Sequence, residues 1–247
     1  MIKEFSLLPI AYQNPNFALG NFIMITPAIK KLAETLGKPV DVVFTIDYVK
    51  QCFLDCPFIN HIPAPKPHNK IVIDSNMVNS AMPDYQYSFQ KVHNILWTKE
   101  YHTYVDSPQE YDYSDQDYLL VLNGLAGTGW KGKKEIPKYA HDIIKQYSKL
   151  PIWFTGSQTD LDVNSPWMGG MADRIELNNI RKALAIVRDA NLIIANDTGL
   201  AHAAGALNKN VLILWKDTPF IKNNNPGKNT QYALKGEWEE KIVNYLK

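Results

Sequence analysis

The sequence predicts an α/β protein of two lobes, each built around a parallel β-sheet. Short apolar runs alternate with helix-period segments through the C-terminal half, which is typical of βαβ units. These runs show no polar alternation, as expected for strands that are covered on both faces. The N-terminal half starts with the same strand, helix and strand pattern, which predicts a second lobe of similar architecture.

In the N-terminal half, strands are predicted at 5–10 and 40–44, with a helix between them at about 21–36. A glycine and a proline follow this helix at 37 and 39, as they do at a helix C-terminus. The periodicity fades from 60 to 117, where one strand is predicted at 70–73. The polar, turn-prone run at 111–117 is the expected linker. It divides the chain into lobes at 1–116 and 117–247.

The C-terminal half shows four strand-like runs separated by helical patterns. Four strands with intervening helices complete one Rossmann-like lobe. The predicted strands are 118–122, 151–154, 192–195 and 211–214, and the predicted helices are 137–149, 179–188, 199–207 and 237–247.

The composition is that of a soluble globular protein. The 247 residues are 45% hydrophobic, and 26 Lys plus Arg balance 25 Asp plus Glu, so the net charge of +1 does not fit a nucleic-acid coat protein. The N-terminal apolar run is too short for a signal peptide, and no stretch approaches the roughly 18 apolar residues of a membrane span. We expect a cytoplasmic protein without a membrane span.

The sequence has two cysteines, Cys52 and Cys56. They lack the second pair of ligands that a zinc site needs, so we expect reduced structural thiols and no metal.

The most informative segment is 192–207, where a buried strand runs into the turn Asn196-Asp197-Thr198 and a helix starts at Gly199. Such a turn presents backbone N–H groups and the positive end of a helix dipole, which suits a phosphate. The Thr198 hydroxyl adds a donor, Gly199 allows close approach of a ligand, and His202 reaches the same anion. The alternative is that Thr198 or Asp197 only caps the helix while His202 is a structural histidine.

Two further loops follow predicted strands. The loop from Asn123 to Lys134, which includes Gly124, is rich in glycine and lysine and can cradle a pyrophosphate, although it matches neither the Walker A nor the G-x-G-x-x-G pattern. Asp160 follows the strand 151–154 and can accept hydrogen bonds from ribose hydroxyls. The alternatives are a solvated glycine loop and an exposed aspartate. The three loops together predict a nucleotide-binding site.

These segments resemble the heptosyltransferase-like glycosyltransferases, glycosyltransferase family 9, which contains ADP-heptose:lipopolysaccharide heptosyltransferases. Residues 196–207 resemble the family's D-[ST]-G-x-x-H-x-A-A signature, and 210–219 resemble the strand and turn that follow it. Lys134-Glu-Ile-Pro is similar to the K-x-W-P entrance to the first donor-lobe helix, and 226–231 to a Gly-Lys-Asn-Gln stretch. Residues 19–29 look like the G-D-x-x-x-x-T-P-A turn and helix that face the acceptor.

The resemblance implies a GT-B-like fold, in which two Rossmann-like lobes face each other across a cleft. It implies transfer of a sugar from a nucleotide-diphosphate sugar to the hydroxyl of a saccharide or another acceptor, with inversion and without a metal or other cofactor. The last helix is expected to pack back on the N-terminal, acceptor-binding lobe. The loops and the resemblance together assign donor binding in the C-terminal lobe to Gly124, Lys134, Asp160, Asp197, Thr198, Gly199 and His202.

Two departures separate the chain from that family. Asn21 occupies the position of the proposed aspartate base, and an amide cannot accept the acceptor's proton. The acceptor lobe is shortened, so the identity of the acceptor does not follow from the family. The sugar also stays open, and it can be a hexosyl, heptosyl or pentosyl group. Other bases in this lobe remain unranked: Asp47, Asp74, Asp84, His61 and His93.

Three alternatives stay open. The first is a phage-type glycosyltransferase acting on a modified base in DNA, suggested by aromatic residues interleaved with Lys66, Lys70, Lys91 and Lys99. The second is a non-catalytic nucleotide-sugar binding module, suggested by Asn21. The third is an unrelated Rossmann-like hydrolase or epimerase, for which the sequence lacks a nucleophile elbow or metal cluster.

Overall fold

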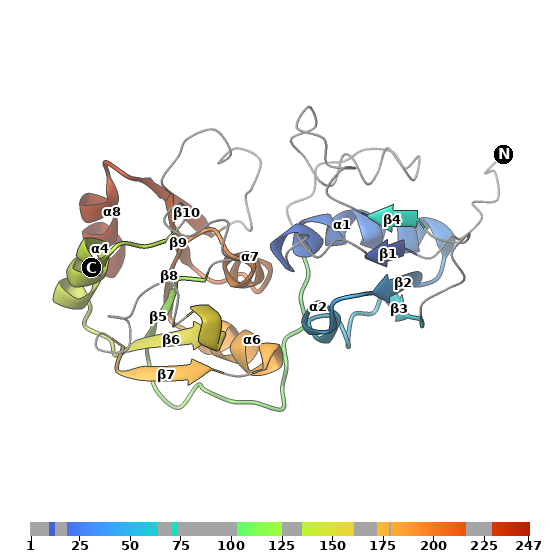
Figure 1. Cartoon of the computed structure of the whole chain (residues 1–247), viewed down its shortest axis with the longest axis horizontal. Coiled ribbons are helices and arrows are strands. Elements are labelled where there is room, and N and C mark those ends of the chain that lie inside the picture. Colours follow the sequence, from blue (N-terminus) through green and yellow to red (C-terminus); the bar gives the residue numbers. More distant parts are fainter. Residues whose placement is uncertain are drawn as a thin grey trace.

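The computed structural model describes residues 10–12, 19–63, 71–73, 103–124, 135–160, 172–177, 179–215 and 229–247. These residues form two α/β lobes, each around a parallel sheet, as the sequence predicts (Figure 1). The sheets lie on either side of the predicted boundary between 116 and 117. None of the helices in the described ranges has the length and hydropathy to cross a membrane.

The N-terminal lobe has a four-stranded sheet in the order β3-β2-β1-β4. Its strands are β1 (Ile10–Tyr12), β2 (Val40–Phe44), β3 (Ile59–His61) and β4 (Ile71–Ile73), and its helices are α1 (Leu19–Leu36) and α2 (Asp47–Gln51). The strand predicted at 5–10 overlaps β1 only at Ile10, since 5–9 lie outside the described residues. The sequence did not predict β3, which is three residues long and lies at the sheet edge.

A proline inside α1 explains why a buried threonine precedes it. Pro27 has no N–H, so it leaves the carbonyl of Ile23 without its helical donor. The Thr26 hydroxyl donates to that carbonyl at 2.7 Å and accepts from the backbone N–H of Tyr104 at 2.8 Å. The Thr26 hydroxyl thus replaces the hydrogen bond that the helix loses at Pro27 and also holds the segment at Tyr104 against α1.

The C-terminal lobe has a six-stranded sheet in the order β10-β9-β8-β5-β6-β7. Its strands are β5 (Leu119–Leu122), β6 (Ile152–Gly156), β7 (Arg174–Leu177), β8 (Leu192–Ala195), β9 (Val211–Trp215) and β10 (Thr230–Leu234), and its helices are α4 (Lys138–Tyr147), α6 (Ile180–Asp189), α7 (Gly199–Ala206) and α8 (Trp238–Leu246). The chain builds the sheet outward from β5 to β7 and then in the opposite direction from β8 to β10. The direction of strand order therefore reverses between β5 and β8, where parallel sheets place their ligands.

The last helix differs from the expectation. It was expected to pack back on the N-terminal lobe, but α8 packs against α4 at the far side of the C-terminal lobe (Figure 1). Its buried side chains Trp238, Ile242 and Leu246 join one apolar cluster with residues of α4. The indole of Trp238 also donates to the carbonyl of Ala233 at the end of β10. Its apolar face is thus covered within its own lobe.

The two lobes share a continuous apolar contact. Helix α1 packs against α7, and α2 packs against α6. Leu184 of α6 and Ala203 of α7 are part of the same buried cluster as the α1 side chains Phe22 and Ile23. The extended segment 103–117 then passes from the N-terminal lobe to the start of β5 (green in Figure 1). This packing brings the N-terminal ends of α1 and α7 together.

Candidate functional site

A pocket of about 480 Å³ opens where the strand order reverses, and both lobes line it. This volume is in the usual range of small-ligand sites. Four of the predicted donor-binding residues line the pocket: Gly124, Asp160, Thr198 and Gly199. Leu19, Tyr48 and Gln51 reach it from the N-terminal lobe. The structure therefore brings together loops that are far apart in the sequence.

The turn between β8 and α7 forms one wall. Thr198 is the N-cap of α7, and its side-chain oxygen accepts a hydrogen bond from the N–H of Ala201 at 3.3 Å. The alternative that Thr198 caps the helix is therefore correct. Thr198 and Gly199 line the pocket, so the start of the helix lies at this wall, which suits an anion. Gly199 has a second, structural reason to be glycine, because an added Cβ would lie 2.9 Å from the Cβ of Leu19.

His202 lies behind this wall and does not line the pocket. Its ring is 5% exposed, and a Cβ added to Gly20 would lie only 2.5 Å from the His202 Cδ2. The His202 Nε2 lies 3.3 Å from Asp197 Oδ1, while Nδ1 is buried and makes no hydrogen bond. The structure thus keeps His202 and Asp197 as a pair beneath the turn, rather than at the surface that a ligand would contact.

Asp160 closes a turn at the end of β6. Its Oδ2 accepts from the N–H of Ser157 at 2.9 Å and from the Ser157 hydroxyl at 2.7 Å, and that hydroxyl in turn accepts from the Asp160 N–H. This reciprocal arrangement is a capping box. A Cβ added to Gly124 would lie 3.6 Å from Asp160 Oδ1 and 3.4 Å from Thr198 Cγ2. The three predicted loops therefore meet at Gly124.

Two asparagines hold these loops from below, a role that sequence reasoning missed. Asn123 and Asn196 each follow a buried strand, and both are fully buried. Asn196 Nδ2 donates to the carbonyl of Gly124 at 2.8 Å, and Asn123 Oδ1 accepts from the N–H of Ile136 at 2.9 Å. Asn123 also lies 3.4 Å from Nε2 of His141, whose pKa burial lowers to about 4. An asparagine directly after each of two buried strands was the available signal.

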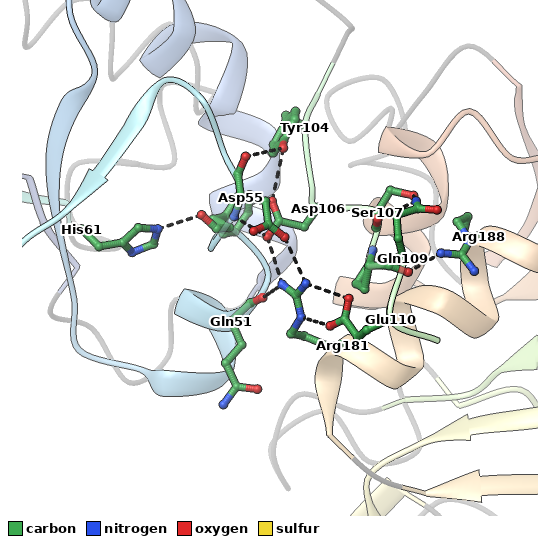
Figure 2. Close-up of polar contacts among 12 residues, drawn as sticks. Gln51, Asp55, His61, Tyr104, Asp106, Ser107, Gln109, Glu110, Arg181 and Arg188 are labelled. Atoms are coloured by element: carbon green, nitrogen blue, oxygen red, sulfur yellow. Dashed lines mark hydrogen bonds and ion pairs between the residues drawn. The ribbon is translucent and has the colours of Figure 1, made fainter. Parts of the chain in front are cut away.

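Arg181 at the start of α6 ties the lobes together beside the pocket. Its guanidinium bonds to Asp55 at 3.0 Å, to Asp106 at 3.3 Å and to Glu110 at 2.5 Å. It also donates to the backbone carbonyl of Gln51 at 3.3 Å, at the end of α2. Figure 2 shows this cluster at the junction of the lobes. Burial raises the pKa of Asp106, and the backbone N–H of Asp55 and the charge of Arg181 oppose that rise.

The position of the family's base is only partly described. Asn21 lies in the first turn of α1, two residues after the pocket residue Leu19, and its side chain is outside the described residues. Of the unranked bases, Asp47 accepts from Gln51 Nε2 at 2.5 Å and His61 contacts the carbonyl of Phe53 at 2.7 Å. Neither lines the pocket. The remaining predicted residues fall outside the described ranges: Lys134, Asp74, Asp84 and His93.

The cysteines behave as structural thiols. Cys52 and Cys56 are free and buried, burial raises the pKa of both, and that of Cys56 reaches about 12. In the described part of the chain, no group of three or more His, Cys, Asp or Glu side chains could hold a metal ion.

Comparison with known proteins finds similarity in the C-terminal lobe and in the fold. The model of glycosyltransferase family 9 (heptosyltransferase) matches residues 170–245. The resemblance to family 9 is confirmed. The matched segment contains β8 and the α7 turn, and it supports the enzyme class that the sequence predicts, a glycosyltransferase. No curated protein matches the chain significantly.

Solved structures confirm the GT-B-type fold. A family 9 glycosyltransferase from Veillonella parvula has a TM-score of 0.70 at 14% identity, over 94% of this chain and 88% of that chain. The E. coli heptosyltransferase WaaC with ADP has a TM-score of 0.64 at 14% identity, over 91% and 92%. The iron-containing dodecameric glycosyltransferase TibC of E. coli has a TM-score of 0.63 at 14% identity, over 91% and 61%. At this identity the likeness establishes the fold alone.

Proposed function

We propose that this protein transfers a sugar from a nucleotide-diphosphate sugar to a hydroxyl group of an acceptor, with inversion and without a metal. The observation that carries the proposal is the meeting of three strand-end loops in one pocket at the point where strand order reverses. One loop presents a helix N-terminus, one a glycine and one a carboxylate. Together they match the diphosphate and the ribose of a nucleotide.

The donor diphosphate would lie on the N–H groups at the start of α7, next to the Thr198 hydroxyl. Asp160 would accept hydrogen bonds from the ribose. The pair of His202 and Asp197 would hold the turn from beneath, and Lys134 would add positive charge from the glycine loop. Stabilising the departing nucleotide in this way would supply the main catalytic contribution without a metal ion. Iron is part of the similar protein TibC, whereas the described residues here show no cluster that would hold it.

The acceptor would approach from the N-terminal lobe, where Leu19 marks the start of α1 at the pocket wall. Asn21 follows in the same helical turn. Its amide can orient an acceptor hydroxyl through a hydrogen bond but cannot take its proton. This single residue favours a second candidate function, a module that binds a nucleotide sugar without transferring it.

A DNA acceptor is not proposed. The four lysines that suggested it lie outside the described residues, and none of the three similar structures points to DNA. Saccharides are therefore the first acceptors to test.

The first experiment measures thermal shifts of the whole protein with nucleoside diphosphates and nucleotide sugars, starting with ADP because WaaC is known with ADP. A ligand that binds only the native state raises the melting temperature by mass action. A shift with one nucleotide supports the donor site, and Thr198→Val should reduce it. Thr35→Val, an exposed position on α1, is the matched control.

A second measurement separates the two candidate functions. Release of free nucleotide diphosphate from the selected nucleotide sugar is followed with a panel of saccharide acceptors. Acceptor-dependent release supports the transferase, and tight donor binding without turnover on any acceptor supports the binding module. Absence of any nucleotide shift contradicts both.

A further inference from the structure

The order of the strands sets the order of the lining residues along the pocket. Thr198 follows β8, Gly124 follows β5, Asp160 lies just after β6, and Asn179 follows β7, and all four line the pocket. Neighbouring strands lie about 4.8 Å apart, so β8 and β7 are separated by roughly 14 Å. A nucleotide with its diphosphate at α7 and its ribose at Asp160 therefore points its base toward the start of α6.

The walls at that end of the pocket come from both lobes. Ile180 and Ala183 of α6 form one side. Tyr48 and Gln51 of α2 form the other, because α2 packs against α6. A space with aliphatic side chains on one side and an aromatic ring on the other suits a flat heterocycle.

Tyr48 is unusual among the aromatic residues that the structure describes in its lobe. Phe22, Phe44 and Phe53 pack against one another with ring centroids 4.8–6.0 Å apart and belong to the core. Tyr48 is instead 46% exposed and lines the pocket. Asp160, the residue proposed to hold the ribose, lines the same pocket.

The backbone of α2 is held in place at this wall. Arg181 of α6 donates to the Gln51 carbonyl, and Gln51 Nε2 bonds to Asp47 in the first turn of the same helix at 2.5 Å. The Cys52 thiol donates to the carbonyl of Tyr48 at 3.2 Å. The position of the Tyr48 backbone is thus set before any ligand arrives, which lowers the entropy lost on binding.

We propose that Tyr48 stacks on the base of the donor nucleotide, so that the N-terminal lobe contributes to nucleotide recognition as well as to acceptor binding. The inference rests on the proposed function, since it takes the diphosphate to lie at Thr198. It adds to that function a nucleotide-binding residue from α2, and it makes nucleotide binding depend on the contact between the lobes.

The test compares Tyr48→Ala, Tyr48→Phe and the wild-type protein by isothermal titration with the nucleoside diphosphate that gives the largest thermal shift. Base stacking on an aromatic side chain contributes about 1–3 kcal/mol, so Tyr48→Ala should weaken binding about 5- to 150-fold. Tyr48→Phe keeps the ring and should bind within about 2-fold of wild type, because stacking does not use the hydroxyl. Tyr147→Ala, which removes a similarly exposed tyrosine from α4, is the control and should bind as wild type does.

Inorganic pyrophosphate, which has no base, is the second probe. Its affinity should be the same for wild type and Tyr48→Ala. Nucleotide binding by Tyr48→Ala that equals wild type, or an equal loss for pyrophosphate, would overturn the stacking role while leaving the donor site intact. Failure of the wild-type protein to bind any nucleoside diphosphate would overturn the proposed function and the stacking role together.

Discussion

Replacing Arg181 with methionine removes a guanidinium that three carboxylates share at the junction of the lobes. Asp55 and Glu110 are 67% and 44% exposed, so their pairs contribute well under about 1 kcal/mol each. Asp106 is fully buried, and breaking a buried pair by removing one partner costs about 3–5 kcal/mol. Asp106 keeps hydrogen bonds from the Asp55 N–H and the Tyr104 hydroxyl, which places the expected loss near the lower limit, at about 3 kcal/mol.

For a chain of this length, about 3 kcal/mol corresponds to a decrease in melting temperature of roughly 6–12 °C. The assay is thermal unfolding followed by circular dichroism at pH 7 and pH 5. Loss of Arg181 raises the pKa of the buried Asp106 carboxyl further above its unfolded value. The folded state then binds a proton more tightly than the unfolded state, so stability rises as pH falls, and the penalty should shrink at pH 5.

Two further variants complete the test. Lys182→Met changes the next residue of α6, which lies over the ring of Tyr111, and should cost less than about 1 kcal/mol. Arg181→Met combined with Asp106→Asn should recover most of the loss, because no buried charge remains. A penalty for Arg181→Met that is within about 0.5 kcal/mol of zero at pH 7 would refute the reasoning. So would a full penalty that is unchanged between pH 7 and pH 5.

Three other predictions test the site and the core. Gly20→Ala places a Cβ 2.5 Å from His202 and should destabilise the protein by about 1–3 kcal/mol in urea unfolding, whereas Gly236→Ala, which meets no atom within 4 Å, should have little effect; equal stabilities would contradict the packing. The folded pKa of His141 is lowered from 6.5 to about 4, so stability is lost as pH falls from 6.5 through 4, by about 3 kcal/mol at most. His141→Gln should remove this part of the acid sensitivity, and an unchanged pH profile of urea unfolding would count against it. Thr26→Val leaves the buried Ile23 carbonyl and the partly buried Tyr104 N–H without their hydrogen bonds and should cost about 2–4 kcal/mol in thermal unfolding; a loss below about 1 kcal/mol would mean that water or the chain replaces them.

The central strands were predictable because each is an uninterrupted apolar run in the sequence. β5 and β9 are buried at every position, and an uninterrupted apolar run is the signature of such strands. β7 and β10 were missed because they lie at the sheet edges and carry polar residues. Their place in the sheet depends on backbone pairing with a neighbour, which side-chain pattern does not report.

The last helix shows the limit of inference from family architecture. Its amphipathic pattern predicted the helix itself, but the partner of its apolar face could not be read from that pattern. The apolar surface of α4 and the end of β10 cover Trp238 within the C-terminal lobe.

What the sequence by itself determined is the set of loops that follow strands. Gly124, Asp160, Thr198 and Gly199 each stand after a strand whose apolar run is recognisable, and parallel strands bring their carboxyl ends to one edge of a sheet. Their convergence could therefore be predicted without knowledge of the fold's details.

Only the tertiary structure decided what comes from the other lobe. Tyr48 lines the pocket because α2 packs on α6, Arg181 finds three carboxylates from distant segments, and His202 is buried because Gly20 of α1 leaves room for its ring. Each of these contacts joins residues far apart in the chain through the packing of two lobes. Helix and strand periodicity describe which face of an element is apolar, but not which element will cover it.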